Sequence, residues 1–101
     1  MNININVLEA KMDQAANLMG MLSQPMRLRI LCILLEGEQS VLNLADKVGL
    51  SQPAMSHHLK KLRETMLVQT RRDGQTIYYS LLGKEVETVL QTLHDLYCVT
   101  D

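Results

Sequence analysis

The stretch from residue 28 to residue 65 constrains the fold more than any other part of this 101-residue chain. The helix predicted at the end of this stretch carries apolar residues at the spacing i, i+4, i+7 and i+11, which places them on one face, up to the residue that follows the stretch: Met55, Leu59, Leu62 and Met66. The opposite face carries hydrogen-bonding and cationic side chains: Gln52, Ser56, His57, Lys60, Lys61 and Arg63. A helix that is apolar on one side and polar and basic on the other suits the major groove of DNA.

A shorter helix and a tight turn precede this amphipathic helix. Gly49 supplies a residue that readily adopts the left-handed conformation of a helix-turn-helix corner. Ser40 and Ser51 are suitable caps for the helices that follow them, and Pro53 is tolerated in a first helical turn. The shorter helix has an apolar face formed by Val41, Leu44, Ala45 and Val48. Together these signals predict a helix-turn-helix.

Three more helices are expected outside this unit. The first has an apolar stripe made of Leu8, Met12, Ala15, Met19 and Leu22. Ser23-Gln24-Pro25 then offers a cap and an N-terminal proline for a helix that is apolar nearly all round from Leu28 to Leu35, which we expect to be the buried centre. The last helix carries apolar residues on one side: Val86, Val89, Leu90, Leu93 and Tyr97.

Between the helix-turn-helix and the last helix the apolar pattern switches to a period of two. Residues 67–72 and 76–81 alternate in this way around Asp73-Gly74, a strong hairpin signal, and the first of these strands is basic. The predicted fold is therefore mainly α with a β-hairpin wing, in the order α-α-α-α-β-β-α. We expect one winged helix-turn-helix domain over residues 1–101.

Size and composition indicate the oligomeric state, the location and the kind of partner to expect. A chain of 101 residues without Trp or Phe has a modest core, and its apolar stripes at both ends favour completing that core by forming a homodimer. No apolar run approaches the roughly 20 residues of a membrane span, and the first residues lack the pattern of a signal peptide, so we expect a cytoplasmic protein. The net charge is −1, yet residues 51–75 hold five basic and two acidic residues, which concentrates positive charge where a nucleic-acid surface needs it.

Three segments resemble the ArsR/SmtB family of small bacterial winged-helix repressors. QPMRLRILCILL resembles the central helix of that family, LSQPAMSHHLKKLRETMLV its recognition helix and RRDGQTIYYSL its wing, and the resemblance extends from Ala16 to Cys98. One departure is Met66, where many members have glycine. A non-glycine residue there would cost about 1 kcal/mol if a left-handed conformation is required.

The resemblance implies a homodimer, formed by the first and last helices, that binds double-stranded operator DNA with an imperfect inverted repeat. Each recognition helix would enter a major groove, with half-sites about 34 Å apart. The family's base-facing positions fall on Gln52, Pro53, Ser56 and His57, while Lys60 and Lys61 add positive charge to the same helix. On the wing, Arg71, Arg72 and Gln75 would meet phosphates or the adjacent minor groove. His58 matches a common family histidine and is interpreted as a packing residue.

Both metal sites known in this family are absent from the sequence. The site for arsenic or cadmium needs a Cys-x-Cys pair on the third helix, which here reads VLNLADKV. The zinc site needs a pattern of four Asp, His or Glu ligands around the last helix. If His94 supplies one of them, the other three positions fall on residues that do not fit the pattern: Leu81, Gly83 and Tyr97.

The two cysteines resemble those of the dithiol subset of the family, the BigR- and HlyU-like regulators that respond to persulfide. In that interpretation one of Cys32 and Cys98 takes sulfane sulfur from a persulfide or polysulfide, the other closes a bridge, and operator DNA is released. His94, four residues before Cys98, is a possible partner for a thiolate. The residues alone leave open that Cys32 is a small core residue and that His94 is solvated.

The residues are also compatible with other functions. The regulator could respond to zinc or a thiophilic ion, for example through Cys32, Cys98 and His94, or it could compete with a silencer at promoters without any redox response. A winged helix used only for protein binding is a further alternative. An enzyme is not expected, because the serines and histidines near Ser56 have no acidic partner beside them and no glycine-rich phosphate loop is present.

Overall fold

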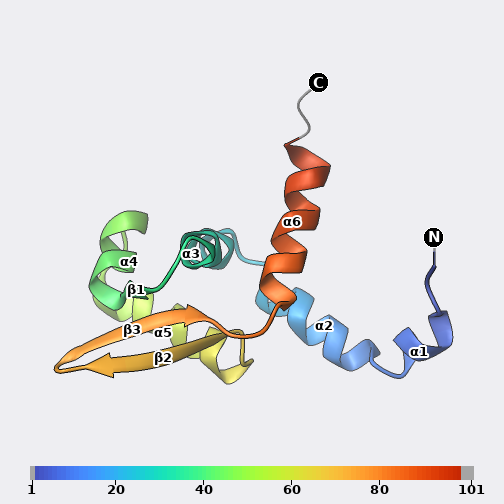
Figure 1. The fold of residues 1–101 in the computed structure, drawn as a ribbon, viewed down its shortest axis with the longest axis horizontal. Coiled ribbons are helices and arrows are strands. Elements are labelled where there is room, and N and C mark those ends of the chain that lie inside the picture. The colour runs from blue at the N-terminus through green and yellow to red at the C-terminus, as the bar shows by residue number, and fades with distance from the viewer. Residues whose placement is uncertain (1, 99–101) are drawn as a thin grey trace.

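The computed structural model describes residues 2–98, and its elements are arranged as in Figure 1. In chain order they are α1 (Ile5–Glu9), α2 (Met12–Met21), α3 (Pro25–Leu35), β1 (Gln39–Ser40), α4 (Val41–Val48), α5 (Gln52–Glu64), β2 (Val68–Asp73), β3 (Thr76–Leu81) and α6 (Glu85–Tyr97). The predicted fold class is confirmed. Two details differ, because the first predicted helix is split into α1 and α2 and a short strand, β1, precedes α4.

The helix-turn-helix forms through the predicted local signals. The Ser40 hydroxyl accepts a hydrogen bond from the Asn43 N–H at 3.1 Å, and the Ser51 hydroxyl accepts one from Ala54 N–H at 3.3 Å, so each serine caps the helix that follows. Gly49 has a φ of 74°, the left-handed conformation expected at the corner. Ser23 does not cap α3, because its hydroxyl donates backward to the Gly20 carbonyl oxygen at 2.7 Å.

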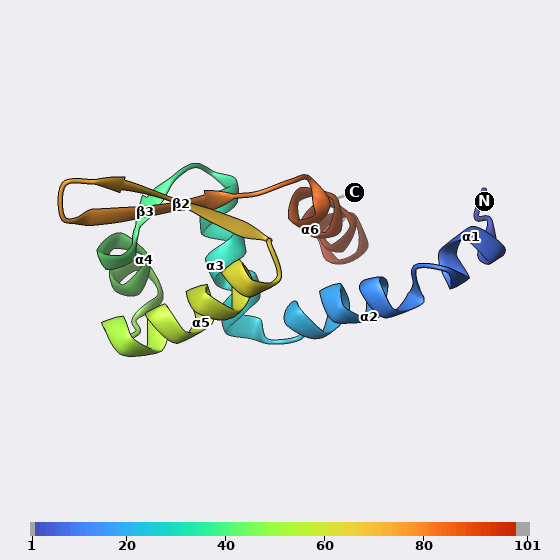
Figure 2. The ribbon, with the colours of Figure 1, turned by 90° about the horizontal axis from the view of Figure 1, so that it is seen from below.

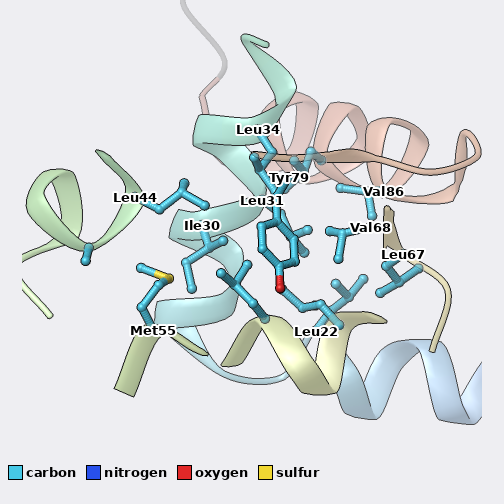
Figure 3. Packing of buried hydrophobic residues seen from close by; sticks show 14 residues of the cluster. Leu22, Ile30, Leu31, Leu34, Leu44, Met55, Leu67, Val68, Tyr79 and Val86 are labelled. Atoms are coloured by element: carbon cyan, nitrogen blue, oxygen red, sulfur yellow. The ribbon is translucent and has the colours of Figure 1, made fainter. Parts of the chain in front are cut away.

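The hydrophobic core surrounds α3, with side chains converging on it from α4, α5, the hairpin and α6 (Figure 3). The predicted inward residues of α5, Met55, Leu59 and Leu62, are fully buried. However, α3 is not buried all round. Ile30, Leu31 and Leu34 face the core, while its remaining side leaves Cys32 exposed.

The three strands form an antiparallel sheet in the order β1-β3-β2. Asp73 pairs with Thr76, so the turn consists of Gly74 and Gln75 rather than of Asp73 and Gly74. Gly74 has a φ of 62° at the first turn position, where a type II′ hairpin requires glycine. The sheet register also joins the wing to the start of the helix-turn-helix, because Ser40 pairs with Tyr78.

Met66 is the only non-glycine residue with a positive φ, 60°, in the described part of the chain. The prediction that it continues the buried stripe of α5 is wrong, since its side chain is 69% exposed. The helix ends at Glu64, and the left-handed residue turns the chain toward β2. This conformation is strained for any residue that has a Cβ atom.

Met66→Gly is therefore expected to raise the free energy of unfolding by about 1 kcal/mol, because glycine adopts a positive φ without that strain. Urea denaturation at a fixed protein concentration measures the change. The matched control is Met66→Ala, which shortens the same exposed side chain but keeps the strained backbone. A gain of equal size in both variants would show that the side chain, not the backbone, is responsible.

The apolar faces of the first and last helices are only partly covered in one chain. Neither α1 nor α2 has a buried residue, and Met19 is 63% exposed. In α6, Val86 and Leu90 are buried, but Leu96 is 64% exposed and Tyr97, on the predicted apolar side, is 80% exposed. Figure 1 shows the far half of α6 extending away from the other elements and α1 at one end of the molecule.

Within residues 2–98, no single helix has both the length and the apolar composition of a membrane span. Helices α2 and α3 reach that length and composition only when they are taken together, and they are bent by 91° relative to each other.

Candidate nucleic-acid interface and thiol pair

Helix α5 presents its predicted polar face to solvent. Figure 2 shows α5 at the surface beside α4, with the hairpin extending past α4. The exposed residues of this face are Gln52, Pro53, Ser56, His57, Lys60, Lys61 and Arg63. Because the opposite face is anchored in the core by Met55, Leu59 and Leu62, these side chains stand on a rigid support. The structure thus brings together every α5 residue that sequence analysis proposes for DNA contact.

His58 differs from its neighbours because it faces the protein. Its Nδ1 accepts a hydrogen bond from the Arg27 Nε at 3.4 Å, and Arg27 Nη1 also donates to the carbonyl oxygen and the sulfur of Met21 at 3.4 and 3.1 Å. Arg27 is buried, although no carboxylate pairs with it among the described residues. This contact ties the end of α2 and the start of α3 to the recognition helix, a link that sequence analysis missed and whose only signal was His58.

The surroundings of His58 give the fold a pH dependence. Desolvation by burial, together with the charge of Arg27 and the nearby His57, lowers the pKa of His58 from 6.5. At a pH between 6.5 and the lowered pKa, the unfolded chain therefore binds more protons than the folded chain. The contribution of His58 to stability is fully present above about pH 6.5 and is lost as the pH falls through this window.

Wild type is expected to lose more unfolding free energy between about pH 7 and about pH 5.5 than His58→Gln, which cannot take up this proton. Urea denaturation at the two pH values measures both losses. His57→Gln, on the exposed side of α5, is the matched control and should keep most of the wild-type pH dependence, because the burial of His58 and the charge of Arg27 remain. Equal losses in wild type and His58→Gln would contradict this role for His58.

The three predicted wing residues do not lie in equivalent surroundings. Arg72 and Gln75 are exposed, and Arg72 makes no ion pair in the described structure. Arg71 is engaged by Glu38, to which it donates two hydrogen bonds of 2.7 and 3.1 Å, and its guanidinium lies over the Tyr78 ring at 4.6 Å. Sequence analysis missed Glu38 because 33 residues separate it from Arg71.

Both cysteines are free thiols and both are exposed. Cys32 lies on α3, and Cys98 is the residue at which α6 ends. The two helices contact each other, but Cys98 follows the far half of α6, which extends away from the other elements (Figure 1). The side chain of His94 is exposed, and its Nδ1 lies 3.6 Å from the Asp95 carboxylate. Its backbone carbonyl oxygen accepts the Cys98 N–H at 2.8 Å, which closes the last turn of α6.

Over residues 2–98, no group of three or more His, Cys, Asp or Glu side chains is arranged to hold a metal ion. A zinc site made by Cys32, Cys98 and His94 of one chain therefore finds no support in the described structure.

Known proteins share both the sequence and the fold. Residues 24–70, which contain the helix-turn-helix and the start of the wing, match the family described as "Bacterial regulatory protein, arsR family". The transcriptional activator HlyU of Vibrio cholerae is 41% identical over 96 residues, which cover 95% of this chain and 89% of that protein. The nodulation protein NolR of Rhizobium meliloti is 51% identical over 83 residues, which cover 82% of this chain and 68% of NolR.

The crystal structure of the transcriptional repressor BigR from Xylella fastidiosa has a TM-score of 0.90 and 35% identity, and the match covers 97% of this chain and 100% of that one. A structure of reduced HlyU from Vibrio cholerae gives a TM-score of 0.83 at 41% identity, with 91% and 97% of the two chains covered. The agreement includes the helix-turn-helix, the wing and the terminal helices. This chain therefore belongs to the ArsR family and is a winged helix-turn-helix transcriptional regulator, not an enzyme.

Proposed function

We propose that the protein is a homodimeric, cytoplasmic repressor that binds an imperfect inverted repeat and releases it when Cys32 and Cys98 become bridged by reactive sulfur species. The observation that carries the DNA-binding part is α5, whose polar face is exposed while its other face is locked in the core. The observation that carries the sensing part is the pair of exposed free thiols on two packed helices, α3 and α6.

The exposed apolar residues of the terminal helices support the dimer. Met19, Leu96 and Tyr97 leave large apolar side chains in contact with water on α2 and α6. Burial of such residues against a second copy is favourable by about 25 cal/mol for each Å² removed from water. A solved winged helix-turn-helix domain from Mycobacterium bovis, 30% identical with a TM-score of 0.76 over 96% of this chain and 93% of that one, is homodimeric.

In this dimer each α5 would enter one major groove. Gln52 and Ser56 can hydrogen-bond base edges, with Gln suited to adenine, while Lys60 and Lys61 neutralise phosphates. Twofold symmetry sets the half-sites about one helical turn, or about 34 Å, apart. The affinity for DNA should therefore depend on the separation of the two recognition helices.

The proposed bridge forms in two thiol-exchange steps. The thiolate of one cysteine attacks the outer sulfur of a low-molecular-weight persulfide, RS–SH, which gives Cys–S–SH and releases the thiolate RS⁻. The thiolate of the second cysteine then attacks the inner sulfur of Cys–S–SH, which forms the disulfide and expels HS⁻. If both cysteines first take a sulfur atom, one persulfide anion attacks the inner sulfur of the other, so that a trisulfide forms and HS⁻ again leaves.

A bridge of either kind would restrain two helices with different tasks. α6 belongs to the proposed dimer surface, whereas α3 packs against α4 of the helix-turn-helix. Joining them would change the distance between the two copies of α5, and an operator tolerates little change in that distance. A coupling free energy of about 1–3 kcal/mol would lower the affinity for DNA roughly 5- to 150-fold.

Two variants test the sensing proposal. Under reducing conditions, Cys32→Ser and Cys98→Ser are expected to bind a DNA duplex selected in vitro by the wild-type protein with unchanged affinity. After exposure to inorganic polysulfide, wild type should release the duplex and both variants should retain it, as measured by gel shift. If both variants still release DNA, the bridge is not the switch. If wild type also retains DNA, the regulator is independent of this redox signal.

A further inference from the structure

Glu38 and Arg71 form a well-directed ion pair between two distant parts of the chain. Arg71 uses Nε and Nη2 to bond the two carboxylate oxygens of Glu38 at 3.1 and 2.7 Å, a bidentate geometry that fixes the plane of the guanidinium. The pairing lowers the pKa of Glu38 and raises that of Arg71, so both groups are charged at neutral pH. A bidentate ion pair restrains orientation more than an ordinary surface pair does.

The same guanidinium is held from a second side. It lies 4.6 Å from the centre of the Tyr78 ring, in cation–π contact with the residue that faces Arg71 across the hairpin. Tyr78 in turn pairs with Ser40 of β1, the residue whose hydroxyl caps α4. Glu38 lies two residues before Ser40, so the ion pair braces the wing against the segment that starts the helix-turn-helix.

We propose that Arg71 is a positioning residue that sets the angle of the wing relative to α5, and that Arg72 supplies the wing's phosphate contact. This inference rests on the proposed binding of DNA by α5 and the wing. Arg71 and Arg72 are neighbours on β2, so their side chains point to opposite faces of the hairpin. Glu38 neutralises the first, whereas the second has no carboxylate partner in the described structure.

Three single variants separate positioning from phosphate binding in gel shifts over a series of salt concentrations. Arg72→Gln should flatten the plot of log affinity against log salt concentration by about 0.9 for each protomer, because a phosphate contact is lost. Arg71→Lys keeps the charge but loses the bidentate geometry, and it should lower affinity on the order of fivefold without changing the slope. Glu38→Gln should match Arg71→Lys, and the double variant should be no worse than either single variant.

A measurement without DNA tests the brace by itself. Glu38→Gln and Arg71→Lys should both speed amide hydrogen exchange in the paired segments of β1 and β3, while Arg72→Gln should not. The proposal is overturned if Arg71→Lys exchanges and binds like wild type. It is also overturned if Glu38→Gln binds DNA more tightly with a steeper salt dependence, since Arg71 would then be a phosphate ligand that Glu38 restrains. If wild type binds no DNA, the proposed function fails, and exchange alone decides whether the brace exists.

Discussion

Leu96→Glu is expected to convert the proposed dimer into monomers and to lower operator affinity by about 10²-fold or more, because each half-site is then bound independently. Leu96 lies on the far half of α6 and is 64% exposed in a single chain. In the proposed dimer that side chain faces the partner, and a carboxylate placed there would lose its hydration without gaining a counter-charge. Met19→Glu on α2 should act in the same way.

The control for these variants is Leu42→Glu. Leu42 is 61% exposed, nearly the same as Met19 and Leu96, but it lies on α4. Figure 1 places α4 on the opposite side of α3 from α6 and α1. Light scattering coupled to size-exclusion chromatography should therefore report a dimer for Leu42→Glu and a monomer for the other two. A dimeric Leu96→Glu would place the interface elsewhere.

Leu59→Ala is expected to lower the free energy of unfolding by about 2–5 kcal/mol, a large part of the stability of a domain of this size. Leu59 is fully buried in the centre of α5, where it joins the recognition helix to the core. Truncation to alanine removes apolar contacts and leaves a cavity that α3 and the wing cannot fill without moving.

The adjacent residue supplies a contrast on the same helix. Lys60 is exposed, so Lys60→Ala should change stability by no more than about 0.5 kcal/mol. It should instead weaken DNA binding and reduce its salt dependence. Urea denaturation measures the stability, at one protein concentration because the proposed dimerisation would stabilise the fold, and gel shifts in parallel measure the binding. A large stability loss in Lys60→Ala would contradict the assignment of the two faces.

The elements that sequence analysis predicted well are those defined by short-range signals. The periodic apolar residues of α5, the caps at Ser40 and Ser51, and the left-handed Gly49 are confirmed because each depends on neighbours within about one or two helical turns. The wing follows from alternation and a nearby glycine. Its turn is shifted by one residue, since the pairing of Asp73 with Thr76 leaves Gly74 at the position that needs a positive φ.

Periodicity could not predict what covers each apolar face. It places Tyr97 on the same side of α6 as the buried Val86 and Leu90, but within one chain Tyr97 is 80% exposed. Similarly, an apolar helix gave no reason to expect that Cys32 would be exposed, since its burial depends on how α3 is oriented among the other elements. The contacts Glu38–Arg71 and Arg27–His58 are set by tertiary structure, and each joins residues more than 30 positions apart.

The exposure of the candidate DNA surface could be predicted from the sequence for a specific reason. A recognition helix must bury one face and expose the other, so periodicity that identifies Met55 and Leu59 as buried also identifies Ser56 and Lys60 as exposed. The thiol pair depended instead on a resemblance, because no spacing rule relates two cysteines on helices that lie far apart in the sequence.

Intact-mass spectrometry of the wild-type protein after exposure to polysulfide tests the central claim most directly. We expect a monomer-mass species in which Cys32 and Cys98 are joined, with a mass consistent with a disulfide or with whole added sulfur atoms, and proteolysis should recover both cysteines in one linked peptide. The same sample should have lost its affinity for operator DNA, and a reductant should restore both the mass and the binding. DNA release with both thiols unmodified, or a complete Cys32–Cys98 bridge with undiminished DNA binding, would contradict the proposed switch.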